Sequence, residues 1–140
     1  MQEFVEVLAH DFPSLRFKPG KKFAFRPPRT VFFEQPTERE SSDASVLDSY
    51  RLRLLHELGH AQLGHTDFVT DVERLKLERA AWEKAREFCA IYNVNYDEDL
   101  IEVELDSYRD WLHNRSRCPE CGLTRYQTVD GASHCPGCML

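Results

Sequence analysis

Two histidines and a glutamate stand at HExxH spacing near the middle of the chain, as His56, Glu57 and His60. If this segment is helical, the two imidazoles lie four positions apart on one face, where both can bind one zinc ion. Glu57 is rotated from that face by about 100°, so its carboxylate can reach a water molecule beside the metal without binding the metal itself. The motif predicts a zinc hydrolase, most directly a peptidase, with Glu57 as the catalytic base.

The neighbours of the motif favour this interpretation over a solvent-exposed helix that carries two histidines by chance. Six apolar residues surround it: Leu52, Leu54, Leu55, Leu58, Ala61 and Leu63. Ionisable side chains in such surroundings need partners. One zinc ion supplies a partner to both histidines.

A catalytic zinc usually has three protein ligands, so a third must come from another segment. After Thr70, the apolar residues form one helical stripe, and Glu78 falls in its centre, whereas other glutamates fall on the opposite side: Glu73, Glu83 and Glu87. A carboxylate in a core-facing stripe is unfavourable unless it is paired. We therefore expect Glu78 to be the third zinc ligand, with Asp71 as second choice. An ion pair of Glu78 with Arg51 or Arg53 is the alternative.

Peptide hydrolysis also needs a hydrogen-bond donor for the developing oxyanion. Four side chains in the predicted helical region are candidates: Tyr92, Tyr96, Tyr108 and His113. The sequence does not choose among them.

Four of the five cysteines form two CxxC pairs separated by thirteen residues: Cys118, Cys121, Cys135 and Cys138. This spacing is typical of a Cys₄ zinc ribbon, so we expect a second, structural zinc. Two disulfides are disfavoured in a reducing compartment, and a redox pair would need a strand-helix context that is missing here. The fifth cysteine, Cys89, lies in an apolar helical stretch and is interpreted as a small buried hydrophobe.

The elements that must position these groups follow from periodicity and turn signals. Helices are predicted at residues 2–10, 45–64, 70–92 and 99–113. Ser45 with Asp48, and Thr70 with Glu73, are predicted capping boxes. The turn Pro19-Gly20 predicts a hairpin of two strands, a third strand follows, and a polar loop leads to the motif helix; their ranges are 15–18, 22–26, 30–34 and 35–44.

The predicted fold class is α+β: a small three-stranded antiparallel sheet packed on the active-site helix and two further long helices, plus a C-terminal zinc ribbon. A chain of 140 residues suffices for one modest core and a small appendage. We therefore divide it into a minimal zinc metallopeptidase domain at residues 1–113 and a Cys₄ ribbon at residues 114–140. No run of 18 apolar residues or signal-peptide pattern occurs, which predicts a soluble, cytoplasmic protein without membrane contact.

Charge is unevenly distributed along the chain. Residues 15–30 carry six basic side chains and no acidic one, while the net charge of the whole chain is −6. The basic segment suits either a solvated surface or phosphate contacts, and the solvated surface is the better interpretation. The overall negative charge disfavours nucleic acid as a partner.

The run from His56 to His65, HELGHAQLGH, with Glu78-Arg79-Ala80-Ala81 after it, resembles the HELGHxxxGH and ExxA signatures of the gluzincin-type peptidases called ImmA/IrrE-like, and also the minigluzincins. The resemblance covers roughly residues 28 to 90. It implies that His56, His60 and Glu78 bind zinc and that Glu57 is the base. It further implies a peptide or protein substrate, such as a regulatory protein, held in extended form by an edge strand at residues 30–34.

Some residues depart from the signatures. Trp82 and Lys84 stand where such proteins tend to have Asn and Phe, and the C-terminal ribbon is an addition. The metzincin motif HExxHxxGxxH would require glycine at position 63 and histidine at position 66, where this chain has Leu63 and Thr66. His65 is five residues beyond His60, about 140° away around an ideal helix, so it cannot share the ligand face unless the helix breaks at Gly64. It is expected outside the zinc ligands, with its imidazole at the C-terminus of the motif helix, where a cation is favoured.

Two other function classes are compatible with the sequence. An SprT-like DNA-associated protease also joins an HExxH helix to a zinc ribbon, and the basic segment would then contact phosphates. A non-enzymatic zinc-binding regulatory module would hold both zincs structurally, which requires a fourth ligand such as His65 or Asp71 at the histidine site.

The assignment of Glu78 can be tested against a glutamate five residues further along the same predicted helix. Glu78→Gln should weaken zinc binding at the histidine site much more than Glu83→Gln, because only position 78 faces the core. Zinc affinity of the two variants, measured by competition with a chromophoric chelator, checks this. Equal losses at both positions would show that the helical register is wrong.

Overall fold

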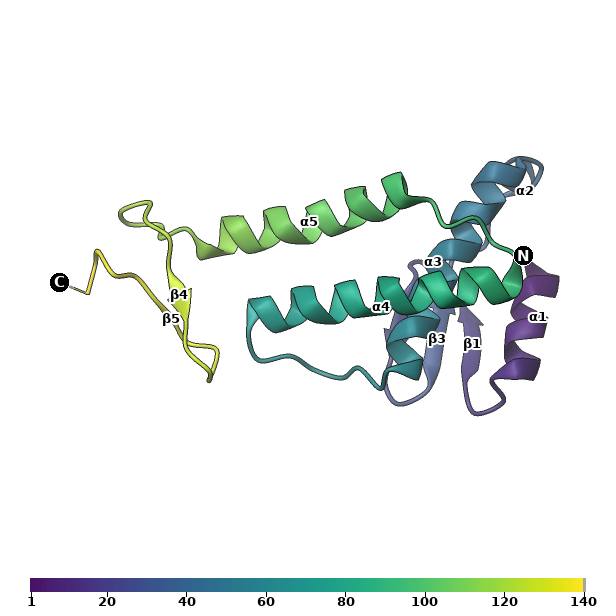
Figure 1. Cartoon of the computed structure of the whole chain (residues 1–140), viewed down its shortest axis with the longest axis horizontal. Helices are drawn as coiled ribbons and strands as arrows, with labels where there is room; N and C mark the ends of the chain where they lie inside the picture. The colour runs from purple at the N-terminus through teal and green to yellow at the C-terminus, as the bar shows by residue number, and fades with distance from the viewer. Residues whose placement is uncertain (140) are drawn as a thin grey trace. The chain divides into compact units, whose positions relative to one another are not determined.

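A computed structural model describes residues 1–139, which form five helices, a three-stranded sheet and a two-stranded sheet (Figure 1). The predicted α+β class is confirmed. The chain divides into two units: Met1–Thr66 with Ala80–Asp97, and Asp67–Arg79 with Glu98–Leu140. The boundary between residues 113 and 114 stays a prediction.

The sheet of the first unit is mixed, so the predicted antiparallel arrangement is wrong. Its strands are β1 (Arg16–Pro19), β2 (Ala24–Arg26) and β3 (Thr30–Phe33), in the order β1-β3-β2. Strand β3 runs parallel to β1 and antiparallel to β2. Because β3 lies between them, β1 and β2 do not form the hairpin predicted around the turn at Pro19-Gly20.

Hydrophobicity explains why β3 takes the central position. Val31 and Phe33 of β3 are buried, whereas no residue of β1 or β2 is buried. A central strand is shielded on both sides, so the most apolar segment loses the most contact with water there. In the observed register Val31 lies between Phe17 of β1 and Phe25 of β2. The expectation that this strand is a free edge for substrate is therefore wrong.

Helix α1 (Gln2–Asp11) closes one end of the first unit and confirms the predicted first helix. Its apolar face buries Val5 and Leu8. At its C-terminus, the Tyr92 hydroxyl donates a hydrogen bond of 2.7 Å to the Asp11 carboxylate. Burial and this acceptor together raise the pKa of Tyr92 to about 12, so the phenol stays protonated and keeps donating.

Helix α3 (Ala44–Gln62) carries the HExxH motif, and its N-cap differs from the prediction. Asp43 caps it by accepting hydrogen bonds from the backbone N–H groups of Ser45 and Val46, at 3.0 and 3.3 Å. The predicted cap at Ser45 is wrong, because a carboxylate two residues earlier reaches the same orphan donors and also favours the positive end of the helix dipole. A short helix α2 (Glu38–Ser41) lies in the stretch predicted as a loop.

The apolar residues of α3 form the centre of the first unit. Four leucines on this helix are fully shielded from solvent: Leu52, Leu54, Leu55 and Leu58. The helix packs on strands β2 and β3. The sheet therefore supports α3 from one side, and the motif occupies the last turns of the helix.

Helix α4 (Asp71–Tyr92) confirms the register predicted for its apolar stripe. Ala81, Trp82, Ala85, Phe88 and Cys89 are buried, whereas Glu73, Glu83 and Glu87 are exposed. The predicted capping box at its start is also confirmed. The Glu73 N–H donates to the Thr70 hydroxyl at 3.2 Å, and the Thr70 N–H donates to the Glu73 carboxylate at 3.0 Å.

In the first unit, α3 and α4 approach each other at Gly59. A β-carbon added at position 59 would lie 2.6 Å from the backbone carbonyl oxygen of Ala81, closer than any real β-carbon contact. Only glycine permits this approach. The next residue of α4, Trp82, is thereby held against the face of α3 that carries His56.

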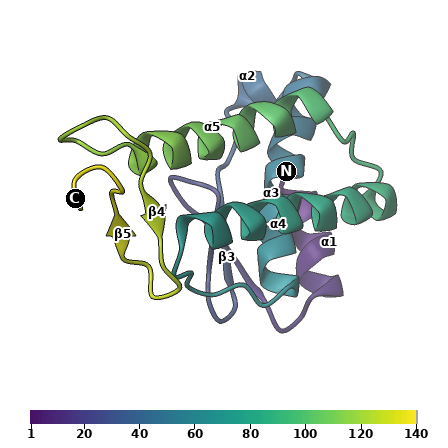
Figure 2. The same cartoon turned by 60° about the vertical axis from the view of Figure 1, so that its left-hand side comes forward.

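The second unit contains the first turns of α4, helix α5 (Glu98–Ser116) and a hairpin of β4 (Tyr126–Gln127) and β5 (Ser133–His134). Figure 2 shows the two strands of the hairpin side by side. Helix α5 extends three residues beyond the predicted end at His113. Ile101 and Leu105 are its buried residues.

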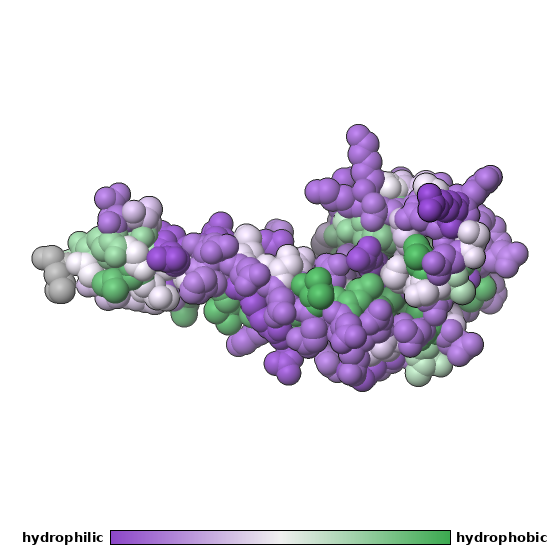
Figure 3. Space-filling model, turned by 90° about the horizontal axis from the view of Figure 1, so that it is seen from above, coloured by the Kyte–Doolittle hydropathy of each residue, from purple (hydrophilic) through white to green (hydrophobic). Residues whose placement is uncertain are grey.

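None of the helices within residues 1–139 is long and apolar enough to cross a membrane. The face seen in Figure 3 is mainly hydrophilic, with scattered apolar residues.

The contact at Gly59 leads to a stability prediction. Gly59→Ala should lower the free energy of unfolding by about 1–3 kcal/mol, because the added methyl group must displace a helix backbone rather than a flexible side chain. Gln62→Ala, at an exposed position of the same helix, should change it by less than about 0.5 kcal/mol. Chemical denaturation of both variants measures the difference. A Gly59→Ala protein as stable as wild type would contradict the close approach of the two helices.

Candidate functional site

Within residues 1–139, two groups of side chains have the composition and spacing of a metal site. The first group joins His56, Glu57 and His60 on the last turns of α3, with one ligand atom from each lying within 4.8 Å of the others. The two imidazole rings lie 4.7 Å apart between centroids, tilted edge to face. The structure thus brings together the three residues of the HExxH motif.

The His56 ring is held between a carboxylate and an indole. Its Nδ1 lies 3.3 Å from Oε1 of Glu57. The ring stacks on Trp82 at 4.0 Å between centroids, with the ring planes only 9° apart. This stacking restricts rotation of the imidazole and shields one of its faces from water. Trp82 was noted in the sequence only as a departure from the family signature, yet it packs directly on a motif histidine.

The His60 ring contacts a histidine that the sequence placed elsewhere. Nδ1 of His60 and Nδ1 of His65 are 2.8 Å apart, a hydrogen-bond distance. The imidazole of His65 was expected at the C-terminus of the helix, as a cation near the last carbonyl groups. It is instead the backbone N–H of His65 that donates to a helix carbonyl, that of His60, at 3.0 Å. The glycine at position 64 was the signal that the chain could turn back here.

The remaining predicted ligand, Glu78, is buried on α4, as the helical stripe predicted. It belongs to the second unit, whereas the histidines belong to the first. Its role as third ligand stays a prediction.

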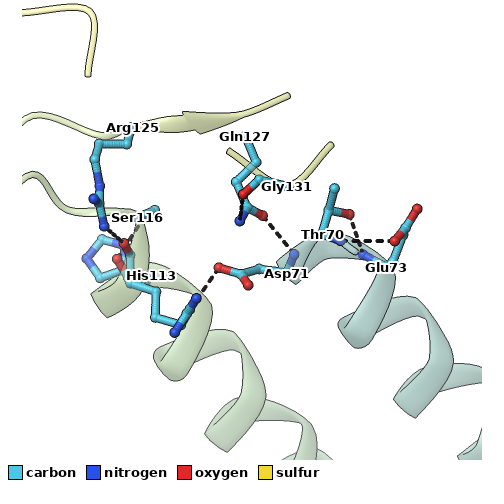
Figure 4. A network of polar contacts seen from close by, with 9 residues as sticks. Thr70, Asp71, Glu73, His113, Ser116, Arg125, Gln127 and Gly131 are labelled. Atoms are coloured by element: carbon cyan, nitrogen blue, oxygen red, sulfur yellow. Dashed lines mark hydrogen bonds and ion pairs between the residues drawn. The ribbon is translucent and has the colours of Figure 1, made fainter. Parts of the chain in front are cut away.

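Asp71, the second choice, has a different role. Its carboxylate accepts a hydrogen bond of 3.0 Å from Nε of Arg115, and its backbone N–H donates to the Gln127 side chain at 2.7 Å (Figure 4). Asp71 therefore ties the start of α4 to α5 and to the β4–β5 hairpin within the second unit. It is buried and paired, so a metal is not needed to explain its burial.

The second group joins Cys118, Cys121, Cys135 and Cys138, whose sulfur atoms all lie within 4.8 Å of one another. The sulfurs of Cys118 and Cys138 are 3.7 Å apart, and those of Cys121 and Cys135 are 3.4 Å apart. Tetrahedral coordination with Zn–S bonds of about 2.3 Å places sulfurs about 3.8 Å apart. All four are free thiols, so they fit a metal and not a pair of disulfides.

The thiols of this cluster differ in how readily they ionise, because hydrogen bonds with the other cysteines raise the pKa values of Cys121 and Cys138, whereas the pKa of Cys118 is lowered. Backbone N–H groups of Cys121 and Glu120 donate to the sulfur of Cys118 and lower its pKa to about 6. Glycines permit the tight turns: Gly122 has a φ of +76°, and a β-carbon at Gly137 would meet the Leu123 side chain at 2.6 Å. A thiolate is the form that binds metals, and the lowered pKa makes Cys118 the readiest of these thiols to reach that form.

Two of the candidate oxyanion donors are engaged elsewhere. The hydroxyl of Tyr92 donates to Asp11, and that of Tyr96 donates to the backbone carbonyl of Trp82 at 3.4 Å. Tyr108 and His113 belong to the second unit and stay candidates. Cys89 is buried, and burial raises the pKa of its thiol to about 11, which agrees with its interpretation as a hydrophobe and not a nucleophile.

No family model, curated protein or solved structure matches this chain. The assignment of function must therefore rest on the two clusters themselves.

The cysteine cluster can be tested with a matched cysteine that lies outside it. Cys118→Ser should remove one bound metal ion per chain, since three thiolates hold a divalent ion less well than four. Cys89→Ser should leave the metal content unchanged, because that thiol lies in the apolar core. Elemental analysis of both purified variants measures the difference. A Cys118→Ser protein with the wild-type metal content would contradict this site.

Proposed function

We propose that this protein is a zinc-dependent endopeptidase that hydrolyses peptide bonds with Glu57 as the general base. The observation that carries the proposal is the grouping of His56, Glu57 and His60 on the last turns of one helix. Two imidazoles suit zinc as ligands, and the carboxylate beside them can serve as a base. The burial of both histidines keeps bulk water away from this group.

The contacts of the two rings favour Nε2 as the metal-binding atom of each. Nδ1 of His56 faces Glu57, and Nδ1 of His60 faces His65. A histidine ligand commonly uses its second ring nitrogen to hold a neighbouring acceptor, which fixes the ring orientation. Both motif histidines have such a neighbour.

Glu78 is the third ligand in this proposal, on the strength of the register of α4. Ala81 lies against Gly59 and Trp82 stacks on His56. Glu78 precedes these two α4 residues by three and four positions, so helical geometry directs it to the same face one turn earlier. Glu78 is buried, whereas Glu73, Glu83 and Glu87 of the same helix are exposed, and this difference supports the same role.

When bound, zinc polarises a carbonyl group and makes water more acidic. Glu57 accepts the proton from the attacking water, because its carboxylate lies beside the histidine ligands without sharing their face. Glu57 then donates that proton to the amine that leaves. Trp82 holds the His56 ring in place and shields it during these transfers.

The second cluster is proposed to hold a structural zinc through four cysteines, as a C-terminal zinc ribbon. Four thiolates close the coordination sphere and leave no position for a substrate. The Gln127 contact with Asp71 gives this hairpin a role in fixing the start of α4. We assign this zinc to stability and not to chemistry.

The resemblance to ImmA/IrrE-like peptidases and minigluzincins supports a peptide or protein substrate in the cytoplasm, such as a regulatory protein. The non-enzymatic alternative requires a fourth ligand at the histidine site. Both candidates have other partners: the Asp71 carboxylate accepts a hydrogen bond from Arg115, and Nδ1 of His65 is hydrogen-bonded to Nδ1 of His60. An open, catalytic site is therefore favoured over a closed, structural one.

The proposal is tested by removing the base without removing a ligand. Glu57→Gln should retain both zinc ions and the fold but lose at least about 100-fold in peptide hydrolysis, the scale of a general base. Cleavage of casein and of a peptide library, together with zinc content, measures this. His60→Ala is the control and should lose one zinc of two.

Survival of near wild-type cleavage in Glu57→Gln would overturn the mechanism. Absence of cleavage by the wild-type protein, with both zincs bound, would favour the regulatory module. If cleavage occurs only with added DNA and weakens steeply with salt, the protein is instead a DNA-associated protease.

A further inference from the structure

The C-terminus of α3 forms a Schellman motif, in which the chain turns back over the last helical turn. Gly64 has a φ of +66°, the left-handed conformation that ends many helices. The N–H of His65 donates to the His60 carbonyl at 3.0 Å, and the N–H of Gly64 donates to the Ala61 carbonyl at 3.2 Å. These are the two hydrogen bonds that define the motif.

This turn returns the side chain of His65 to the helix residue five positions earlier. In most Schellman motifs the side chains at these two places make an apolar contact. Here they are two imidazoles, with ring centroids 5.0 Å apart and Nδ1 atoms 2.8 Å apart. The contact is therefore a hydrogen bond, and one ring must donate its Nδ1 proton to the other.

We propose that His65 is a positioning residue that fixes the tautomer and orientation of His60 for metal binding. This inference rests on the proposed function, because it assumes a metal held by His56 and His60. A His60 that binds metal through Nε2 carries its proton on Nδ1, and His65 accepts that proton in a hydrogen bond. The Gly64 turn holds the acceptor in place through the backbone.

The geometry distinguishes this role from direct metal binding by His65. His65 contacts His60 through Nδ1, the nitrogen that stays available for a hydrogen bond when Nε2 binds the metal. It is not part of the group formed by His56, Glu57 and His60 among the described residues. The hydrogen bond is thus made between the two rings and not through a shared metal.

The test compares the wild-type protein with two variants by zinc affinity at the histidine site. His65→Phe keeps the ring contact but removes the acceptor, and it should weaken zinc binding by about 10-fold or more, as loss of a partner behind a ligand usually does. His65→Asn places an amide oxygen near the position of Nδ1 and should recover most of the affinity. Competition with a chromophoric chelator measures all three affinities, and zinc retained in the cysteine cluster shows that the variants fold.

A second readout separates positioning from general stability. In the zinc-loaded wild type, ¹⁵N spectra of the imidazoles should show His60 protonated on Nδ1 and bound through Nε2. The Nδ1 proton should be protected from exchange, and this protection should disappear in His65→Phe and return in His65→Asn. Gly64→Ala should weaken zinc binding in the same direction, since its β-carbon meets nothing within 4 Å and only the turn is strained.

The outcomes distinguish this inference from the proposed function. If His60→Ala loses one zinc but His65→Phe keeps the wild-type affinity and His60 tautomer, the positioning role of His65 is wrong while the metal site stands. If the ¹⁵N shifts show His65 itself bound to zinc, it is a ligand and the inference is also wrong. If His60→Ala retains both zincs, the metal site fails and His65 has nothing to position.

Discussion

The contact between Gly59 and the Ala81 carbonyl sets the distance between two helix backbones in the first unit, and the histidine cluster depends on it. Gly59, which has no side chain, lies in the motif three residues after His56 and directly before His60. Because the backbones touch there, Trp82 is close enough to stack on His56. Helix α3 also packs on strands β2 and β3, and four of its leucines are fully buried. The cluster therefore lies on a helix that is packed against both α4 and the sheet.

Local sequence signals predicted the elements around this contact well. The motif helix, the register of α4 and the capping box at Thr70 all depend on residues within a few positions of one another. Helical periodicity and capping are short-range effects, so a single sequence contains them. The same holds for the CxxC pairs, because the two cysteines of each pair are only three positions apart.

Contacts between distant segments were harder to predict. The order of the strands depends on which one gains most from a central position, and a turn signal such as Pro19-Gly20 cannot show that a third strand will lie between the two it joins. Asp71 was considered a metal ligand because its burial was foreseeable but its partner Arg115, 44 residues away, was not. The position of His65 was predicted by extending an ideal helix past Gly64, where the backbone in fact adopts the left-handed conformation.

The position of β3 also bears on how separate copies of this protein behave. In the three-stranded sheet β3 is paired on both sides, so the outer edges belong to β1 and β2, and each of these strands is no more than four residues long. Arg16 and Lys18 are exposed on β1, and Arg26 is exposed on β2, which Pro27 follows directly. Short edges that carry like charges or end at a proline resist pairing with the edge of another molecule. The basic segment that suggested phosphate contacts thus also protects the sheet from aggregation.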